Sequence, residues 1–252
     1  MQSNSASRGI LSILIAEIVS VAGSVTAGAY FIYELLRVSA IFSGIAESYN
    51  LSSLTALNAT YYNSTVMSRI VLPFARSMMP VLLNVLIIAT LFGIAVMALQ
   101  VVGWRRLEAY RRELFRWPYI GSYFGLFGIL LTALPSIAIL EAVMPYVVSG
   151  PSPGSPPSWL AALLLLAIPI MLGVLFMLIW IVTFQLGVWR IGSAFASPLA
   201  KASVVLFVII LIAGIALSGL LILKLSLEVI YELLLIAGLY VAYSHSRSQQ
   251  PA

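Results

Sequence analysis

Long apolar runs dominate this sequence and restrict the folds open to it. Several runs reach about 18 residues, which is enough for a helix rising about 1.5 Å per residue to cross a hydrocarbon layer roughly 30 Å thick. Only 8% of the 252 residues are charged, against about 25% in soluble domains. The runs do not alternate in polarity as barrel strands do. We therefore predict an all-α fold, a polytopic membrane helix bundle that forms a single integral-membrane domain over residues 1–252.

One short connection, residues 103–117, is strongly basic and orients the predicted bundle. It holds five of the thirteen Lys and Arg residues: Arg105, Arg106, Arg111, Arg112 and Arg116. Short loops rich in Lys and Arg stay on the cytoplasmic side of a membrane. Alternation from this inner-leaflet loop places nine basic residues inside and four outside. We predict six transmembrane helices with both termini inside (N-in/C-in), in the plasma membrane.

The six predicted spans cover about residues 10–36, 80–103, 118–147, 159–188, 202–223 and 225–243. The first resembles a secretory signal, but it is too long and Glu17 interrupts it, so we expect it to be retained. Pro118 is predicted in the first turn of the third span. Ser197-Pro198 has the pattern of an N-cap followed by a first-turn proline at the fifth.

The outer loop, residues 37–79, carries three Asn-x-Ser/Thr sequons among the five asparagines of the chain: Asn50, Asn58 and Asn63. Sequons predict N-glycosylation where a loop is extracytoplasmic. Apolar residues recur at helical spacing on both flanks of the loop, so we expect the first two spans to continue outward as helices. The sequence predicts a glycosylated knob there.

Two spans end in the same way. Gln100 and Trp104, followed by Arg, close the second span, and Gln185 and Trp189, followed by Arg, close the fourth. Each Trp is expected at the headgroup belt, and each Gln can hydrogen-bond to a neighbouring helix. Either the second-to-third and fourth-to-fifth spans form a two-hairpin internal repeat, or inward-running helices commonly end this way.

Ionisable residues inside apolar spans are the first candidates for function in a membrane protein. The candidates are Glu17, Glu228, Glu232 and Glu141. Glu17 and Glu232 approach mid-membrane, and Lys224, Glu228 and Glu232 share one helical face. One interpretation is an outer acidic vestibule, with Glu34, leading to a protonatable Glu. The other is an interfacial Lys–Glu pair and one Glu hydrogen-bonded between helices.

The sequence lacks the residues that several kinds of chemistry require. There is no Cys and no Asp, and His245 is the only histidine, which excludes disulfides, thiol nucleophiles and the common haem and zinc ligand sets. The Walker and His-Glu-x-x-His motifs are absent. We expect no enzyme activity, no cofactor and no metal site. The basic residues border spans, so the expected partners are membrane lipids and not nucleic acid.

Two further patterns concern packing and the membrane surface. Leu107, Tyr110, Leu114 and Phe115 fall near one face of the basic segment, so it is either an amphipathic helix docking on lipid or a partner, or an ordinary inside loop. Small residues spaced four apart let helices approach closely. They occur at Gly121/Gly125, Gly214/Ser218 and Gly238/Ala242.

The motifs GWRRLEAY…YIGSYFG and VWRIGSAF…LAKASVVL resemble an uncharacterised family of archaeal multi-pass membrane proteins, mostly from thermophilic lineages. The resemblance covers roughly residues 80–243. It implies an archaeal, thermophilic source and brings no activity or catalytic residues.

These observations predict a non-enzymatic membrane protein, an accessory or structural subunit of a larger assembly or a homo-oligomer. The alternative is a small transporter or channel for protons, cations or small solutes that uses its intramembrane Glu residues. A membrane enzyme acting on lipid would need Ser, Glu and Arg to converge on one cavity.

Overall fold

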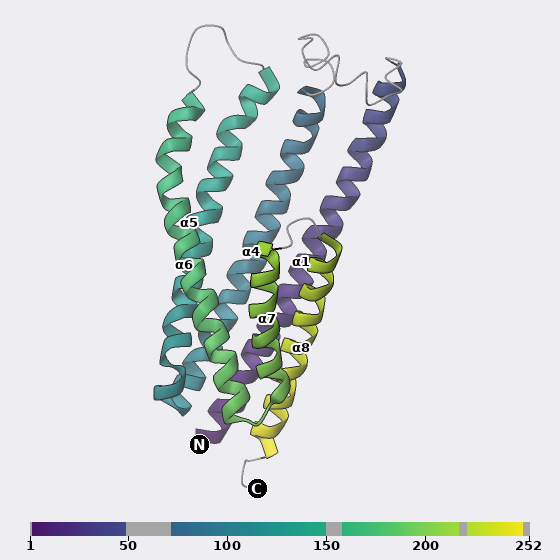
Figure 1. The fold of residues 1–252 in the computed structure, drawn as a ribbon. Coiled ribbons are helices and arrows are strands. Elements are labelled where there is room, and N and C mark those ends of the chain that lie inside the picture. Colours follow the sequence, from purple (N-terminus) through teal and green to yellow (C-terminus); the bar gives the residue numbers. More distant parts are fainter. Residues whose placement is uncertain (1, 49–71, 150–157, 217–220, 249–252) are drawn as a thin grey trace. The chain divides into compact units, whose positions relative to one another are not determined.

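All regular secondary structure in the described part of the chain is helical. A computed structural model describes residues 2–48, 72–149, 158–216 and 221–248. They form six helices: α1 (Gln2–Ser48), α4 (Leu72–Tyr110), α5 (Arg112–Ser149), α6 (Ser158–Ala194), α7 (Pro198–Ala216) and α8 (Leu221–Ser248) (Figure 1). Five are long and apolar enough to cross a membrane, and α7 is a shorter apolar helix. The all-α membrane fold is confirmed, whereas the sixth span and the orientation stay predictions.

The helices extend beyond the predicted spans. α4 runs to Tyr110 and α5 begins at Arg112, so Arg111 alone separates them. The amide of Phe115 donates to the Arg111 carbonyl (3.2 Å), which closes the turn. Pro118 therefore lies beyond the first turn of α5, and the prediction that it stands in a first helical turn is wrong. The basic segment is apolar at helical spacing, and this keeps it helical up to the turn.

The expected helical continuation of the first two spans into the flanks of the loop over residues 37–79 is confirmed as far as the structure describes it, and its outward direction stays a prediction. α1 continues to Ser48, and α4 already begins at Leu72. The three sequon asparagines, Asn50, Asn58 and Asn63, lie outside the described residues.

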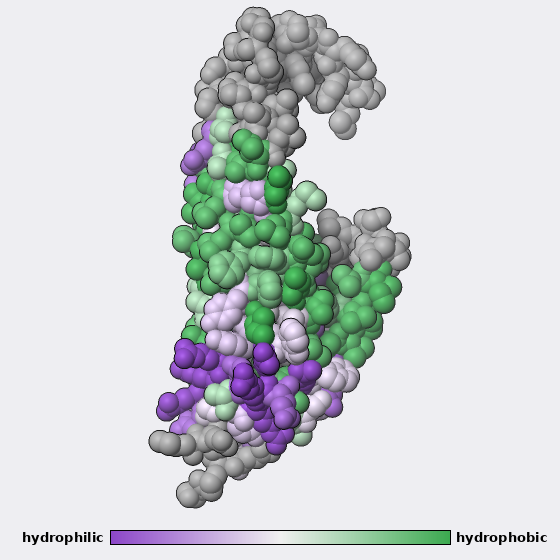
Figure 2. All heavy atoms as spheres, turned by 90° about the vertical axis from the view of Figure 1, so that its left-hand side faces the viewer, coloured by the Kyte–Doolittle hydropathy of each residue, from purple (hydrophilic) through white to green (hydrophobic). Residues whose placement is uncertain are grey.

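The chain divides into two compact units. Unit 1 comprises residues 1–22, 92–130 and 173–252, and unit 2 comprises residues 23–91 and 131–172. Within unit 1, the start of α1, the end of α8, the α4–α5 turn and the α6–α7 turn lie at one end (Figure 1). The predicted N-in/C-in topology requires this arrangement. Hydrophilic side chains gather at the same end, next to a hydrophobic helix surface (Figure 2).

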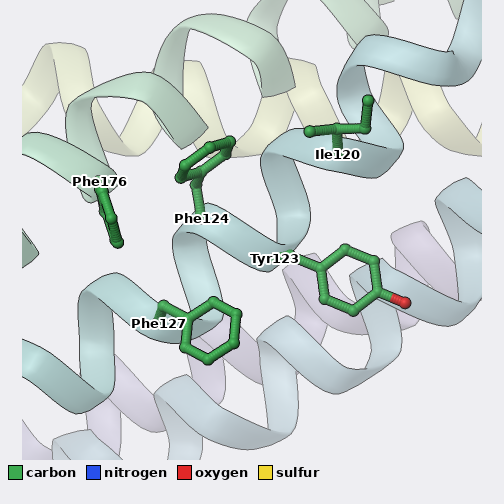
Figure 3. A pocket seen from close by; sticks show the side chains of 5 residues that line it. All are labelled: Ile120, Tyr123, Phe124, Phe127 and Phe176. Atoms are coloured by element: carbon green, nitrogen blue, oxygen red, sulfur yellow. The ribbon is translucent and has the colours of Figure 1, made fainter.

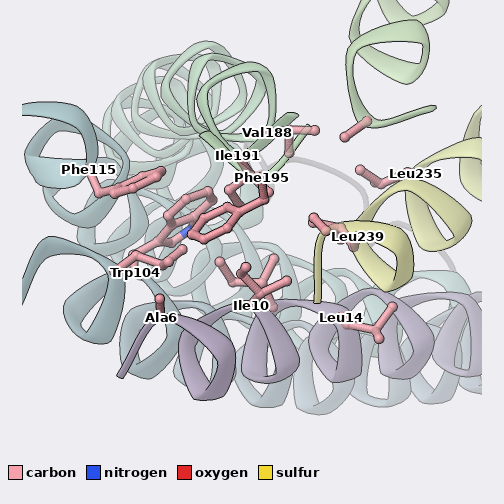
Figure 4. Close-up of a cluster of buried hydrophobic side chains, with 14 of the residues drawn as sticks. Ala6, Ile10, Leu14, Trp104, Phe115, Val188, Ile191, Phe195, Leu235 and Leu239 are labelled. Atoms are coloured by element: carbon pink, nitrogen blue, oxygen red, sulfur yellow. The ribbon is translucent and has the colours of Figure 1, made fainter. Parts of the chain in front are cut away.

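The core of unit 1 forms around Trp104 (Figure 4). Its ring stacks on Phe115 at 6.3 Å and meets Phe184 edge-on at 6.0 Å between centroids. Trp104 is fully buried among the helices, and its predicted depth at the headgroup belt stays a prediction. Leu107 and Phe115 are also fully buried. The apolar face of the basic segment packs inside the protein, so the hypothesis that this face docks on lipid is wrong.

All five arginines of the basic segment remain exposed: Arg105, Arg106, Arg111, Arg112 and Arg116. Their guanidinium groups lie on the exposed faces of α4 and α5, whereas the opposite faces of these helices contribute to the hydrophobic core. This separation is what an amphipathic helix end at a protein surface requires.

Glycines let the helices of unit 1 approach closely. A Cβ at Gly103 of α4 would lie 2.9 Å from the Gly9 carbonyl oxygen of α1. On α5, Gly121 and Gly125 face Thr183 and Trp180 of α6, and Gly238 of α8 faces the backbone of α7. The predicted small-residue packing is confirmed for these two motifs. Ser218 of the third motif lies outside the described residues.

Helix α7 begins as the sequence predicts. Ser197 precedes Pro198, and its Oγ accepts a hydrogen bond from the Ala200 amide (3.4 Å). The same hydroxyl donates to the Gly238 carbonyl of α8 (2.7 Å). The N-cap thus also joins α7 to α8, which are antiparallel neighbours (Figure 1).

Unit 2 contains the second half of α1, the first half of α4 and parts of α5 and α6. Its helices α1 and α4 are joined by a hydrogen bond from Asn84 Nδ2 to the Tyr30 hydroxyl (2.9 Å). Glu34 forms an ion pair with Arg37 (3.4 Å) one turn along α1.

Candidate functional site

Polar side chains from three helices form a buried chain inside unit 1. Glu17 of α1 is 6% exposed and Gln100 of α4 is 1% exposed. Gln100 Nε2 donates to Glu17 Oε1 (2.9 Å), and Trp180 Nε1 of α6 donates to Gln100 Oε1 (2.9 Å). One amide thus joins a carboxyl group to an indole across α1, α4 and α6.

A second polar pair adds α8. Gln185 Nε2 of α6 donates to the Tyr231 hydroxyl (2.7 Å). The next residue, Glu232, interacts electrostatically with both Glu17 and Tyr231. We call this set the carboxyl network; it comprises Glu17, Gln100, Trp180, Gln185, Tyr231 and Glu232.

The local sequence explains why the carboxyl network is buried. On α1, Glu17 follows the buried Ile10 and Ile13 at helical spacing. On α4, Gln100 lies between the buried Met97 and Trp104. Residues three and four apart share one face of a helix, so both polar side chains belong to the stripes that pack against neighbouring helices.

The carboxyl network holds more acceptors than donors. Glu232 Oε2 and Gln185 Oε1 are buried without a hydrogen-bond partner. Neither Glu17 nor Glu232 forms an ion pair with another described residue. Buried carboxylates are costly unless they are compensated. A proton or a small cation would satisfy the Glu232 carboxyl group.

A larger metal centre is not evident in the same region. Among the described residues, no group of three or more His, Cys, Asp or Glu side chains could hold a metal ion.

The structure brings together some predicted site residues and separates others. Gln100 and Gln185 each hydrogen-bond to a neighbouring helix, as predicted. Their tryptophans differ, because Trp104 is buried whereas Trp189 is exposed with Lys201 Nζ 5.5 Å above its ring.

The structure brings together only some residues of the predicted acidic vestibule. Glu228 is half-buried and interacts electrostatically with Glu232. Glu141 is exposed and Glu34 is paired with Arg37, and both belong to unit 2. The side chain of Lys224 lies outside the described set.

Sequence reasoning missed Trp180 and Tyr231. Trp prefers the membrane interface, so a Trp in the middle of a span signals a partner for its N–H. No sequence signal identified Tyr231, because consecutive residues of a helix do not face each other and its bond to Gln185 depends on how α6 and α8 pack.

The fold and the carboxyl network define a multi-pass membrane protein with a polar centre among its helices. No protein-family model, curated protein or solved structure matches the chain. The resemblance to archaeal membrane proteins therefore stays a prediction.

Proposed function

We propose that this protein is a small membrane carrier that loads a proton or a small cation at Glu17 and Glu232. The supporting observation is the setting of Glu17. Its carboxyl group is buried in an apolar helix, hydrogen-bonded to the neutral amide of Gln100 and near a second carboxyl group. Ionisable groups kept at such places in membrane proteins commonly mark ion or proton pathways.

Loading would change the force between two helices. Glu17 belongs to α1 and Glu232 to α8. Two like charges in a medium of low dielectric repel each other strongly, and a bound proton or cation removes that repulsion. The empty and loaded states therefore favour different α1–α8 arrangements, which a carrier needs in order to couple binding to movement.

Proton flux into sealed vesicles tests this proposal. Full-length protein is reconstituted into vesicles containing a pH-sensitive dye, and a pH gradient is imposed. We expect Glu17→Gln and Glu232→Gln each to lower the flux about tenfold or more, which corresponds to only about 1.4 kcal/mol. Glu113→Gln, at an exposed carboxyl in the first turn of α5, is the matched control and should behave as wild type. Wild-type flux from both test variants would refute the proposal.

A second candidate is a structural or accessory subunit. The observation that favours it is a stripe of exposed apolar side chains on α6 within unit 1: Val174, Leu178, Val182 and Leu186. Spaced four apart, they form one continuous face that another subunit can cover. A wild-type flux no higher than that of empty vesicles would favour this candidate over the carrier.

A further inference from the structure

An aromatic groove lies on the outer surface of α5 and α6 in unit 1. It has a volume of about 510 Å³ and is lined by Ile120, Tyr123, Phe124 and Phe127 of α5 and Phe176 of α6 (Figure 3). Phe124 and Phe176 meet edge-on at 5.1 Å, so two rings from different helices fix its wall. Phe127 remains 53% exposed. The Tyr123 hydroxyl is the only polar group among these side chains.

One end of the groove is polar and positively charged. The Tyr123 hydroxyl shares a hydrogen bond with that of Tyr119 (2.9 Å), and Tyr119 interacts electrostatically with Arg105 of α4. Arg116 lies one turn before Ile120 on the same face of α5. It is exposed and forms no ion pair with any described residue. Glu108 also interacts with Tyr119, but its carboxylate is already paired with Arg112 (3.7 Å).

The distance between the charged end and the aromatic wall suits one lipid. Arg116 and Phe127 are eleven residues apart on a continuous helix, which corresponds to about 16 Å along its axis. A hydrocarbon core is about 30 Å thick, so one leaflet supplies roughly half of that. An acyl chain beside Phe127 would therefore place its headgroup near Arg116.

We propose that the groove binds an anionic phospholipid, with one acyl chain along the aromatic wall. The phosphate would lie at Arg116 and Arg105 and accept one hydrogen bond, from whichever hydroxyl of the Tyr119–Tyr123 pair does not donate to the other. Charge complementarity selects the ligand, because unpaired arginines at a membrane surface favour anionic over zwitterionic headgroups.

Native mass spectrometry of the full chain in detergent micelles tests this proposal. The protein is titrated with dioleoyl phosphatidylglycerol or, separately, dioleoyl phosphatidylcholine. We expect the wild type to retain one phosphatidylglycerol more tightly than phosphatidylcholine. Arg116→Gln should weaken phosphatidylglycerol retention about fivefold, the effect expected of one basic residue at a lipid surface. It should leave phosphatidylcholine unchanged. The matched control is Arg111→Gln, since Arg111 is equally exposed but lies over the Tyr110 ring.

A second variant separates the acyl chain from the headgroup. Phe127→Ala removes an exposed side chain of the groove wall, so the fold should persist and retention of both lipids should fall. Equal retention of the two lipids by the wild type, or wild-type retention by Arg116→Gln, would overturn the proposal. A dimer that Phe127→Ala weakens would also overturn it, by assigning the groove to a second copy of the chain.

Discussion

Gln100 uses both ends of its side-chain amide at once. Its nitrogen donates to Glu17 and its oxygen accepts from Trp180. An amide suits this position because it offers both a donor and an acceptor. The residue therefore satisfies a carboxyl group and an indole in a place that water does not reach.

Replacing this amide should destabilise the fold. Gln100→Leu keeps a similar volume but leaves Glu17 and Trp180 without their partners. Leaving buried polar groups without partners costs about 1–3 kcal/mol. We therefore expect the free energy of unfolding, measured in mixed micelles, to fall by that amount. Asn84→Leu breaks a single exposed hydrogen bond to Tyr30 and should cost only about 0.6 kcal/mol. Equal losses from the two variants would contradict a special role for Gln100.

At the scale of the helix, contact between α1 and α4 depends on two glycines. Gly9 and Gly103 face each other, and a Cβ at Gly103 would also lie 2.6 Å from Ile13 Cγ1. This approach keeps the stripes that carry Glu17 and Gln100 in contact. Neither glycine belongs to one of the small-residue motifs found in the sequence, because the pair is formed by two different helices.

A methyl group at this crossing should separate the helices. We expect Gly103→Ala to lower the free energy of unfolding by about 1–3 kcal/mol, the usual cost of overpacking. Gly28 is the matched control on α1, since a Cβ there would meet nothing within 4 Å. Gly28→Ala should be neutral or stabilise by about 0.5–1 kcal/mol through its helix propensity. Thermal unfolding in one detergent compares the two, and equal shifts would contradict the model of the crossing.

The sequence predicted most of the helices, but it did not predict which side chains of different helices contact each other. Apolar runs predicted the helices, because span length follows from membrane thickness. The helix ends were missed around Arg111, where an amphipathic segment continues α4 and α5 almost without interruption. Glu17, Gln100, Gln185 and Glu232 stood out as polar residues in apolar spans. Their pairing did not, because it depends on how helices rotate against one another, which periodicity alone does not determine.

At the scale of the whole molecule, the predicted orientation can be tested because the chain has no cysteine. Single cysteines are introduced as Ala109→Cys before the α4–α5 turn, Ser248→Cys at the end of α8, and Ser155→Cys in the connection predicted to be outside. In sealed cells, a membrane-impermeant maleimide should label only Ser155→Cys. The other two should react after permeabilisation, because Lys/Arg-rich loops stay inside. Labelling of Ala109→Cys in intact cells would reverse the topology.

Arg111 alone connects α4 to α5, so the two helices have little freedom to move independently of each other. Gln100 lies about 16 Å from the turn along α4, and the aromatic groove begins at a similar distance from the turn along α5. If the proposed loading at Glu17 tilts α4, we expect α5 to move with it, because Arg111 alone separates the two helices. A lipid bound in the groove on α5 would then oppose this movement. The membrane's own composition would set how readily the carboxyl network changes state.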